Sequence, residues 1–392
     1  MGVFKVKKNS NVQIGIYLIS ILMMGVVGIA SSLGVVAGHF PEKSMTDIQV
    51  GLISVPCIVI MIVTLLMGKL MDIFSKKSLA IIGILLFLVG GIAPAYMSSF
   101  SAITVLRGVF GAGVGILQVV STALVAENFE GAERERVQGN LQAFQMIGCA
   151  IMVFVGGWLG AKGWNIAFYV HAIGIVSLIA ALIFIPNVKP NAAKTAGGSQ
   201  TKEKAQLTGL MWVWMVIAFF VFCTGQIFSN NNAFLVADRG LGDSAASGLG
   251  MAFFCAGGIL MGFLYGKVAK AFGKFTMAAG FFVVAISYVV VALAANIGMF
   301  YAGCLIFGLG LSIAMPNVFL NVGNSVAPAA VGLALSIATC VQNFGQFCSP
   351  YIVNPIAGAI GGTPSVSSFY VGAAMGCILG VAMLIKAAAE KK

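Results

Sequence analysis

The sequence predicts an all-α membrane protein with twelve transmembrane helices. Of its 392 residues, 60% are hydrophobic and only 8% are charged, and the mean hydropathy is +1.03. The charged residues collect in the gaps between apolar stretches of about 20 residues, the length at which a helix crosses a bilayer core. A large soluble core would require helices with a polar face, and these segments are apolar all round. The composition therefore excludes an ordinary water-soluble domain.

Twelve apolar segments follow one another along the chain. The polar segment 187–207, with Pro, Gly, Ser and Lys, separates the first six from the last six and predicts a flexible linker. We therefore expect a six-helix bundle over residues 1–188, a cytoplasmic linker over 189–206 and a second six-helix bundle over 207–392. The expected spans are 13–38, 48–70, 78–98, 101–127, 136–161, 164–186, 208–237, 244–267, 275–296, 298–323, 331–357 and 366–387.

Two short motifs of the first half recur in the second half at nearly the same offset. The segment 68–77 (GKLMDIFSKK) corresponds to 266–274 (GKVAKAFGK), and 109–115 (VFGAGVG) corresponds to 306–312 (IFGLGLS). Two motif pairs at one offset indicate a duplication, so the two bundles are expected to be pseudo-symmetric. Duplicated six-span halves are typical of transporters, which bind their substrate between the repeats.

The distribution of Lys and Arg predicts the orientation in the membrane. With both termini in the cytoplasm, 18 of the 22 basic residues fall on the cytoplasmic side, and only Lys43, Lys162 and Arg239 fall outside. The net charge of +11 therefore indicates basic residues that fix the topology and contact anionic lipid headgroups, and it does not indicate nucleic-acid binding. We expect a multi-pass protein of the cytoplasmic membrane.

The same motifs make the chain resemble the major facilitator superfamily over essentially its whole length. The segment 68–77 resembles the family's loop motif G-x-L-x-D-R-x-G-R-K, although Ile73 and Ser75 depart from it. The segment 107–111 resembles the fourth-span motif R-x-x-Q-G, with Phe110 in place of the Gln. The resemblance implies an alternating-access transporter. The matching positions are Gly68, Leu70, Asp72, Lys76, Lys77, Arg107, Gly111, Glu127, Arg134 and Gly139.

The resemblance implies that Asp72 latches the two halves on the cytoplasmic side. A carboxylate there can meet the positive N-terminus of the helix that starts near Val331, and Arg134 or Arg136 can complete the charge cluster. The alternative is a solvated loop acid. The expected gating residues are Gly68, Asp72, Lys76, Lys77, Glu127, Arg134 and Arg136.

Arg107 is the one basic residue that lies deep inside an expected span, about six residues from the outer end of 101–127. Ionisable side chains at membrane depth are costly unless they face water or a partner. The resemblance implies that the fourth span lines the central cavity, so we expect Arg107 to face this cavity and attract an anion. The alternative is an arginine that snorkels outward or binds backbone carbonyls. All eleven acidic residues fall in loops or at span ends. Arg107 thus lacks an obvious counter-charge, which favours an anionic or neutral substrate.

Amide side chains recur at helical spacing within the spans. Such spacing places each set on one helix face, where the amides either line a wet cavity or hydrogen-bond neighbouring helices. The expected cavity amides are Gln118, Gln226, Asn230, Asn317, Gln342 and Gln346.

These patterns predict a secondary transporter of a small organic solute, with an organic anion favoured. An efflux pump for lipophilic compounds is the alternative, and a non-transporting receptor or scaffold is a remote one. We expect no enzyme activity, catalytic residue, metal site or cofactor, since no nucleophile–base pair or metal-ligand cluster is visible; coupling to H⁺ or Na⁺ stays open. The expected partners are the substrate and the lipid bilayer, with no nucleic acid, and the expected state is a monomer.

Overall fold

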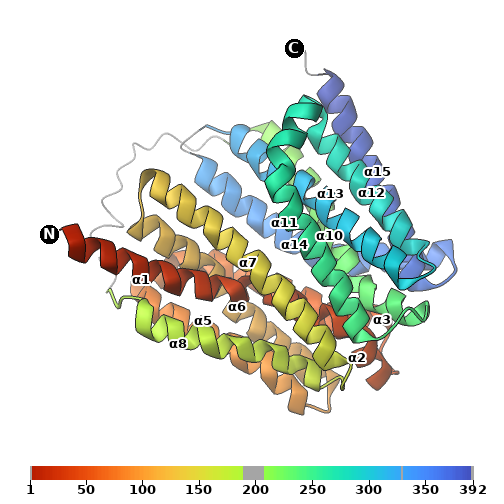
Figure 1. The fold of residues 1–392 in the computed structure, drawn as a ribbon, viewed down its shortest axis with the longest axis horizontal. Coiled ribbons are helices and arrows are strands. Elements are labelled where there is room, and N and C mark those ends of the chain that lie inside the picture. Colours follow the sequence, from red (N-terminus) through yellow and green to blue (C-terminus); the bar gives the residue numbers. More distant parts are fainter. Residues whose placement is uncertain (1, 189–206, 328–329, 390–392) are drawn as a thin grey trace. The chain divides into compact units, whose positions relative to one another are not determined.

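The computed structural model describes residues 2–188, 207–327 and 330–389, and these residues form helices joined by short turns (Figure 1). The predicted linker 189–206 lies outside the described residues. Their internal contacts divide the chain into two units, unit 1 (Met1–Ile29 and Gly51–Thr201) and unit 2 (Ala30–Val50 and Lys202–Lys392). The segment 30–50 thus packs with unit 2, although it precedes most of unit 1 in the sequence.

Unit 1 contains the helices of the first half except the segment 30–50. Two glycines of α6 (Phe100–Asn128) allow close packing with its neighbours. A Cβ on Gly111 would lie 2.6 Å from the Pro56 carbonyl oxygen of α4 (Val55–Ile73), and a Cβ on Gly113 would lie 2.5 Å from the Gly83 carbonyl oxygen of α5 (Lys76–Ile92). The elements are α1 (Gly2–Ser20), most of η1 (Ile21–Ser32), η2 (Val50–Ser54), α4 (Val55–Ile73), α5 (Lys76–Ile92), η3 (Ala93–Tyr96), α6 (Phe100–Asn128), α7 (Gly131–Gly160), η4 (Ile166–Ile173) and α8 (Gly174–Phe184).

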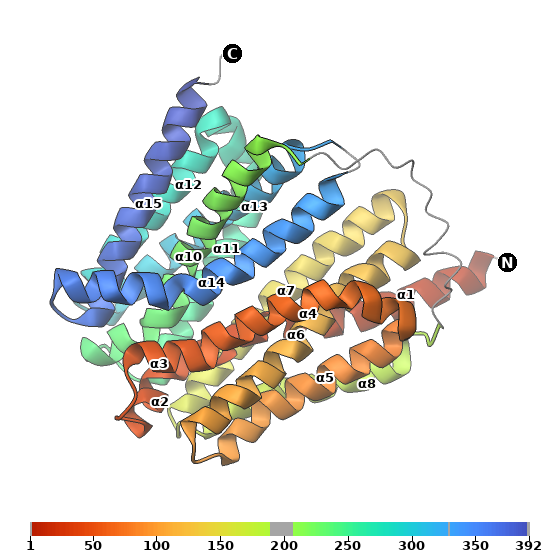
Figure 2. The same cartoon turned by 180° about the vertical axis from the view of Figure 1, so that it is seen from behind.

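Unit 2 repeats this packing with the matching glycines of α13. A Cβ on Gly308 would lie 2.0 Å from the Phe254 carbonyl oxygen of α11, and one on Gly310 would lie 2.8 Å from the Val284 nitrogen of α12. The recurring glycine motif therefore marks equivalent helix contacts in the two units. The elements are α2 (Leu33–His39), α3 (Met45–Gln49), α10 (Gly209–Asp238), α11 (Ser244–Phe272), η5 (Gly273–Phe275), α12 (Thr276–Ala292), α13 (Ile297–Asn324), α14 (Val331–Ile360) and α15 (Pro364–Ala389) (Figure 2).

Eleven helical stretches of the described residues are long and apolar enough to cross a membrane. One of them, Ser244–Ala292, has 49 residues and comprises α11, η5 and α12. A straight helix of that length would extend about 74 Å, more than twice the thickness of a bilayer core, so a single crossing would not use its length. The count of twelve stays a prediction that this length supports.

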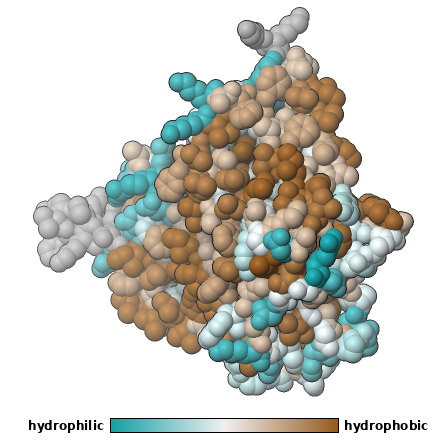
Figure 3. Space-filling model, turned by 45° about the vertical axis from the view of Figure 1, so that its right-hand side comes forward, coloured by the Kyte–Doolittle hydropathy of each residue, from teal (hydrophilic) through white to brown (hydrophobic). Residues whose placement is uncertain are grey.

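Many large apolar side chains are exposed along these helices, among them Val105, Phe263 and Ile378. Figure 3 shows a broad hydrophobic area on one face, with hydrophilic side chains gathered mainly above and below it. Such a surface is stable where lipid covers it. The chain is therefore a multi-pass membrane protein.

Four described segments of the first half, η1 to η4, depart from α-helical winding. The segment η1 is a 3-10 helix with a kink at Met24, and η2 is a π-helix. Both windings shift the hydrogen-bond register away from the usual four-residue step. Carbonyl groups in these segments are therefore oriented for partners on other helices.

Candidate functional site

The Arg107 side chain of α6 is fully buried inside unit 1. Its Nε donates a hydrogen bond of 2.9 Å to the Leu52 carbonyl oxygen of η2, and one terminal nitrogen lies 3.4 Å from the Val26 carbonyl oxygen of η1. The other terminal nitrogen lies 3.4 Å from His171 Nε2. The guanidinium thus joins α6 to η1, η2 and η4.

Aromatic rings and a histidine complete the surroundings of Arg107. The guanidinium carbon lies 4.1 Å from the Phe110 ring centroid, a cation–π contact in a buried setting. His171 Nδ1 lies 2.9 Å from the Phe168 carbonyl oxygen. A neutral imidazole satisfies both contacts when Nδ1 donates to that carbonyl and Nε2 accepts from Arg107.

This geometry matches the alternative in which Arg107 binds backbone carbonyls. An incoming anion has no access to a side chain with no exposed surface in this conformation. The cavity role of Arg107 stays a prediction. Sequence reasoning did not connect His171 with Arg107, since the two lie 64 positions apart and no local spacing links them.

A second polar group lies in unit 2, where amides from α3, α10 and α14 meet. Gln49 Nε2 donates to the Asn230 carbonyl oxygen at 3.1 Å and to Asn231 Oδ1 at 3.0 Å. Asn354 Nδ2 donates to Gln49 Oε1 at 2.8 Å and to Thr46 Oγ1 at 2.9 Å. We call these five residues the amide cluster.

Several amide atoms in and beside the cluster have no partner among the described residues. They are Asn230 Nδ2, Asn354 Oδ1 and both polar atoms of the Asn232 side chain. Buried polar atoms without a partner are rare in stable proteins, because each costs about 1–3 kcal/mol. Water or the polar groups of a solute would satisfy them, so the cluster is a candidate for solute binding.

The predicted amides have different surroundings. Gln226 Nε2 donates to Asn230 Oδ1 at 3.2 Å, so Gln226 is linked to the amide cluster through Asn230. Asn317 instead accepts from the Tyr265 hydroxyl at 3.2 Å and donates to the Ile313 carbonyl oxygen at 2.7 Å. Gln118, Gln342 and Gln346 are half-buried on α6 and α14. Gln49 and Asn354 were missed because each is a single amide whose partners lie far along the chain.

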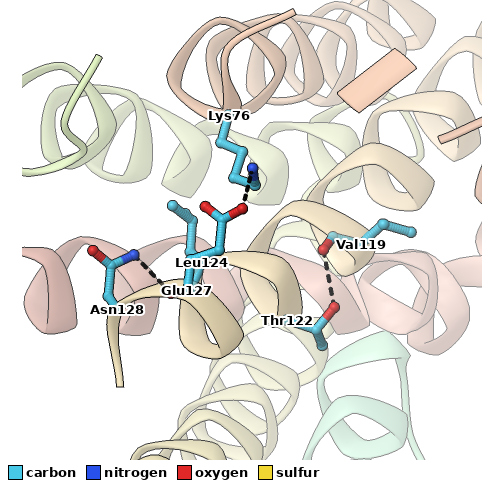
Figure 4. Close-up of polar contacts among 6 residues, drawn as sticks. All are labelled: Lys76, Val119, Thr122, Leu124, Glu127 and Asn128. Carbon is cyan, nitrogen blue, oxygen red and sulfur yellow. Dashed lines mark hydrogen bonds and ion pairs between the residues drawn. The ribbon is translucent and has the colours of Figure 1, made fainter. Parts of the chain in front are cut away.

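The predicted gating residues lie at one end of unit 1. Lys76 Nζ forms an ion pair with Glu127 Oε1 at 2.6 Å (Figure 4). Lys77 Nζ donates to the Leu182 carbonyl oxygen at 2.6 Å. Arg136 lies 3.9 Å from Glu133, one turn away on α7. Figure 4 also shows Asn128 bonded to the Leu124 carbonyl at the end of α6.

Asp72 is exposed at the end of α4 and forms no hydrogen bond or ion pair within the described part of unit 1. Gly68 lies one turn earlier, and a Cβ there would meet no atom within 4 Å. Glu127 pairs with Lys76 rather than with Arg134. The latch between Asp72 and the start of α14 stays a prediction.

Comparison with known proteins places these features in a family. The family model of the Major Facilitator Superfamily matches residues 14–350. Multidrug transporter protein MdtP of Bacillus subtilis is 25% identical over 114 residues, which cover 29% of this chain and 21% of MdtP. Multidrug resistance protein Stp of Mycobacterium tuberculosis is 33% identical over 121 residues, which cover 30% of this chain and 22% of Stp. The match thus spans about a fifth of the length of these relatives.

Solved structures share the fold over nearly the whole chain. The nucleoside transporter NupG superposes with a TM-score of 0.77 at 14% identity, covering 97% of this chain and all of NupG. The D-xylose-proton symporter superposes with a TM-score of 0.75 at 16% identity, covering 98% and 97% of the two chains. Because the family model matches most of its length, the chain belongs to the Major Facilitator Superfamily.

Proposed function

We propose that this protein is a secondary transporter that carries a small organic solute across the cytoplasmic membrane by alternating access. Membership of the superfamily and the shared fold support this proposal. The amide cluster supports it independently, because buried amides with unsatisfied atoms are costly to keep without a solute or water to bind. We infer from the basic residues that both termini face the cytoplasm.

For the substrate, we favour export of lipophilic compounds that carry neutral hydrogen-bonding groups. The observation behind this preference is the burial of Arg107 against backbone carbonyls, because an anionic substrate cannot reach this arginine, the one basic residue buried among the described residues. The polar atoms that a solute could engage are then amides such as Asn230 and Asn232. The relatives MdtP and Stp are named as multidrug proteins, which agrees with this choice.

An organic anion is the second candidate, and one observation favours it. No Asp or Glu is buried among the residues that the structure describes, so a lipophilic cation would find no counter-charge there. An anion would need a conformation in which Arg107 gains access to solvent.

Flux into proteoliposomes tests the proposal. Purified protein is reconstituted, and uptake of a labelled neutral lipophilic amide, a labelled carboxylate and a labelled lipophilic cation is compared with protein-free vesicles. We expect protein-dependent flux of the neutral compound and a strong reduction in Asn230→Leu, with Asn324→Leu, at the exposed end of α13, as the matched control. Flux of the carboxylate alone would favour the anion carrier, and no flux of any compound would contradict transport of these classes.

A further inference from the structure

A cavity of about 210 Å³ opens at one end of unit 2, apart from the amide cluster. Its lining comes from η5, α12, α13 and α15, and α12 and α15 lie side by side in both ribbon views (Figures 1 and 2). The polar lining consists of two lysines, two asparagines and a threonine, and no carboxylate is among the lining residues. They are Lys274, Thr276, Asn317, Asn321 and Lys386.

The groups around this cavity favour a negative charge. Lys274 Nζ lies 5.6 Å from the Phe275 ring centroid and Lys386 Nζ lies 5.1 Å from the Trp214 ring centroid, so aromatic rings hold both ammonium groups near the cavity. Thr276 begins α12 directly after η5, and its hydroxyl donates a hydrogen bond of 2.6 Å to the Gly273 carbonyl oxygen.

The asparagines supply hydrogen-bond donors beside these charges. Asn321 Nδ2 donates one hydrogen to the Asn317 carbonyl oxygen at 2.7 Å, and Asn317 Nδ2 donates one to the Ile313 carbonyl oxygen at 2.7 Å. Each amide nitrogen carries two hydrogens, so each has a second one to donate. Ammonium groups and amide N–H groups together match the oxygens of a phosphate group.

The surface beside the cavity is apolar and exposed. Phe272 and Phe275 lie next to Lys274, and Val381, Leu384 and Ile385 lie on α15 within five positions of Lys386; all five side chains are exposed. In a membrane such side chains contact acyl chains. A phosphate in the cavity can therefore belong to a lipid whose chains run along these residues, whereas a free phosphate would gain nothing from them.

We propose that this cavity binds the phosphodiester headgroup of an anionic phospholipid. The lysines bind the phosphate, the asparagines donate hydrogen bonds to it, and the exposed side chains of α15, η5 and the end of α11 contact the acyl chains. The inference does not depend on the transported solute, because the cavity lies outside the amide cluster.

Native mass spectrometry of the full chain tests this site. Delipidated protein in detergent is mixed with equal amounts of phosphatidylglycerol and phosphatidylcholine, and retained lipid is counted. We expect the wild type to retain phosphatidylglycerol preferentially and Lys274→Gln/Lys386→Gln to retain at least fivefold less. The control Lys267→Gln/Lys270→Gln removes the same charge from exposed lysines outside the cavity and should retain the wild-type amount. Equal losses in both double variants would mean diffuse attraction to surface lysines and would overturn the proposal.

A second pair of variants changes the cavity without removing a lysine. Asn321→Asp keeps the side-chain shape and adds a negative charge, so it should reduce phosphatidylglycerol retention as strongly as the cavity lysine pair. Asn324→Asp adds the same charge one turn later at an exposed position and should leave retention unchanged. Inorganic phosphate at millimolar concentration should not displace the lipid. Displacement by phosphate, or retention unaffected by Asn321→Asp, would overturn the assignment to a lipid headgroup.

Discussion

Replacing Arg107 distinguishes its structural role from a role in substrate binding. The variant Arg107→Met keeps most of the side-chain volume and removes the charge and every donor. The wild-type side chain makes one well-formed bond to the Leu52 carbonyl at 2.9 Å, two weak contacts at 3.4 Å and a cation–π contact with Phe110. Loss of these contacts leaves two carbonyls of irregular helices without a partner.

The magnitude follows from these contacts. A hydrogen bond to a charged group contributes about 1.5–3 kcal/mol, and the two long contacts and the ring add about 1–2 kcal/mol together. Part of this gain is offset, because the variant no longer has to bury a charge. We therefore expect Arg107→Met to destabilise the folded protein by about 3 kcal/mol. Arg107→Lys should recover only part of this, because an ammonium cannot reach carbonyls on both helices as a planar fork does.

Thermal unfolding of the purified protein, followed by fluorescence-detected gel filtration, measures the effect. Arg136→Gln is the control, since its ion pair with Glu133 is exposed and should contribute little. We expect a clear fall in the midpoint for Arg107→Met and no shift for Arg136→Gln. An unchanged midpoint for Arg107→Met, together with selective loss of carboxylate transport, would refute the structural role and restore the predicted anion site.

Three further predictions concern other parts of the molecule. Gln49→Leu removes three interhelical hydrogen bonds at roughly 0.6 kcal/mol each, so residues 44–50 should become about 2 kcal/mol less protected in hydrogen–deuterium exchange; unchanged protection would count against the amide cluster as a tether. Gly308→Leu should abolish the peak of folded protein in gel filtration, because even a Cβ there would lie 2.0 Å from a backbone oxygen. Gly266 has open space around it, so Gly266→Leu should fold. Equal yields of the two variants would contradict the packing. If the predicted latch exists, Asp72→Asn should raise the inward-open fraction in cross-linking across the cytoplasmic entrance, and equal fractions would exclude it.

Hydrophobicity alone predicted nearly all the helices, because spans of about 20 apolar residues have few alternatives in a membrane. The glycine repeat was predictable for a similar reason, since two close helix contacts per unit require residues without a side chain. The irregular winding of η1 and η2 could not be read from their residues. Each of these two segments has a carbonyl that accepts from Arg107, and these carbonyls lie 55 and 81 positions from Arg107 in the sequence.

Only part of the amide cluster could be predicted, because sequence spacing reveals residues on one helix face but not contacts between distant segments. Gln226 and Asn230 share a face of one helix, so their spacing reveals them. Gln49 and Asn354 lie 305 positions apart and are joined only by the tertiary fold. Likewise, the preference for an anion rested on the charge of Arg107, whereas its burial and its partners depend on three other elements.

The chain passes between the two units at Ile29–Ala30 and at Val50–Gly51, and both crossings fall inside helices with non-α winding. A 3-10 turn and a π turn each differ from an α turn by one step in the hydrogen-bond ladder, so either one can be rewound by exchanging neighbouring carbonyl partners without breaking the helix. Rewinding by one step changes both the length of the helix and the rotation of the residues beyond the turn. The Arg107 guanidinium binds one carbonyl in each of these two segments, so a rewinding of either one would have to exchange or lose its bond to Arg107.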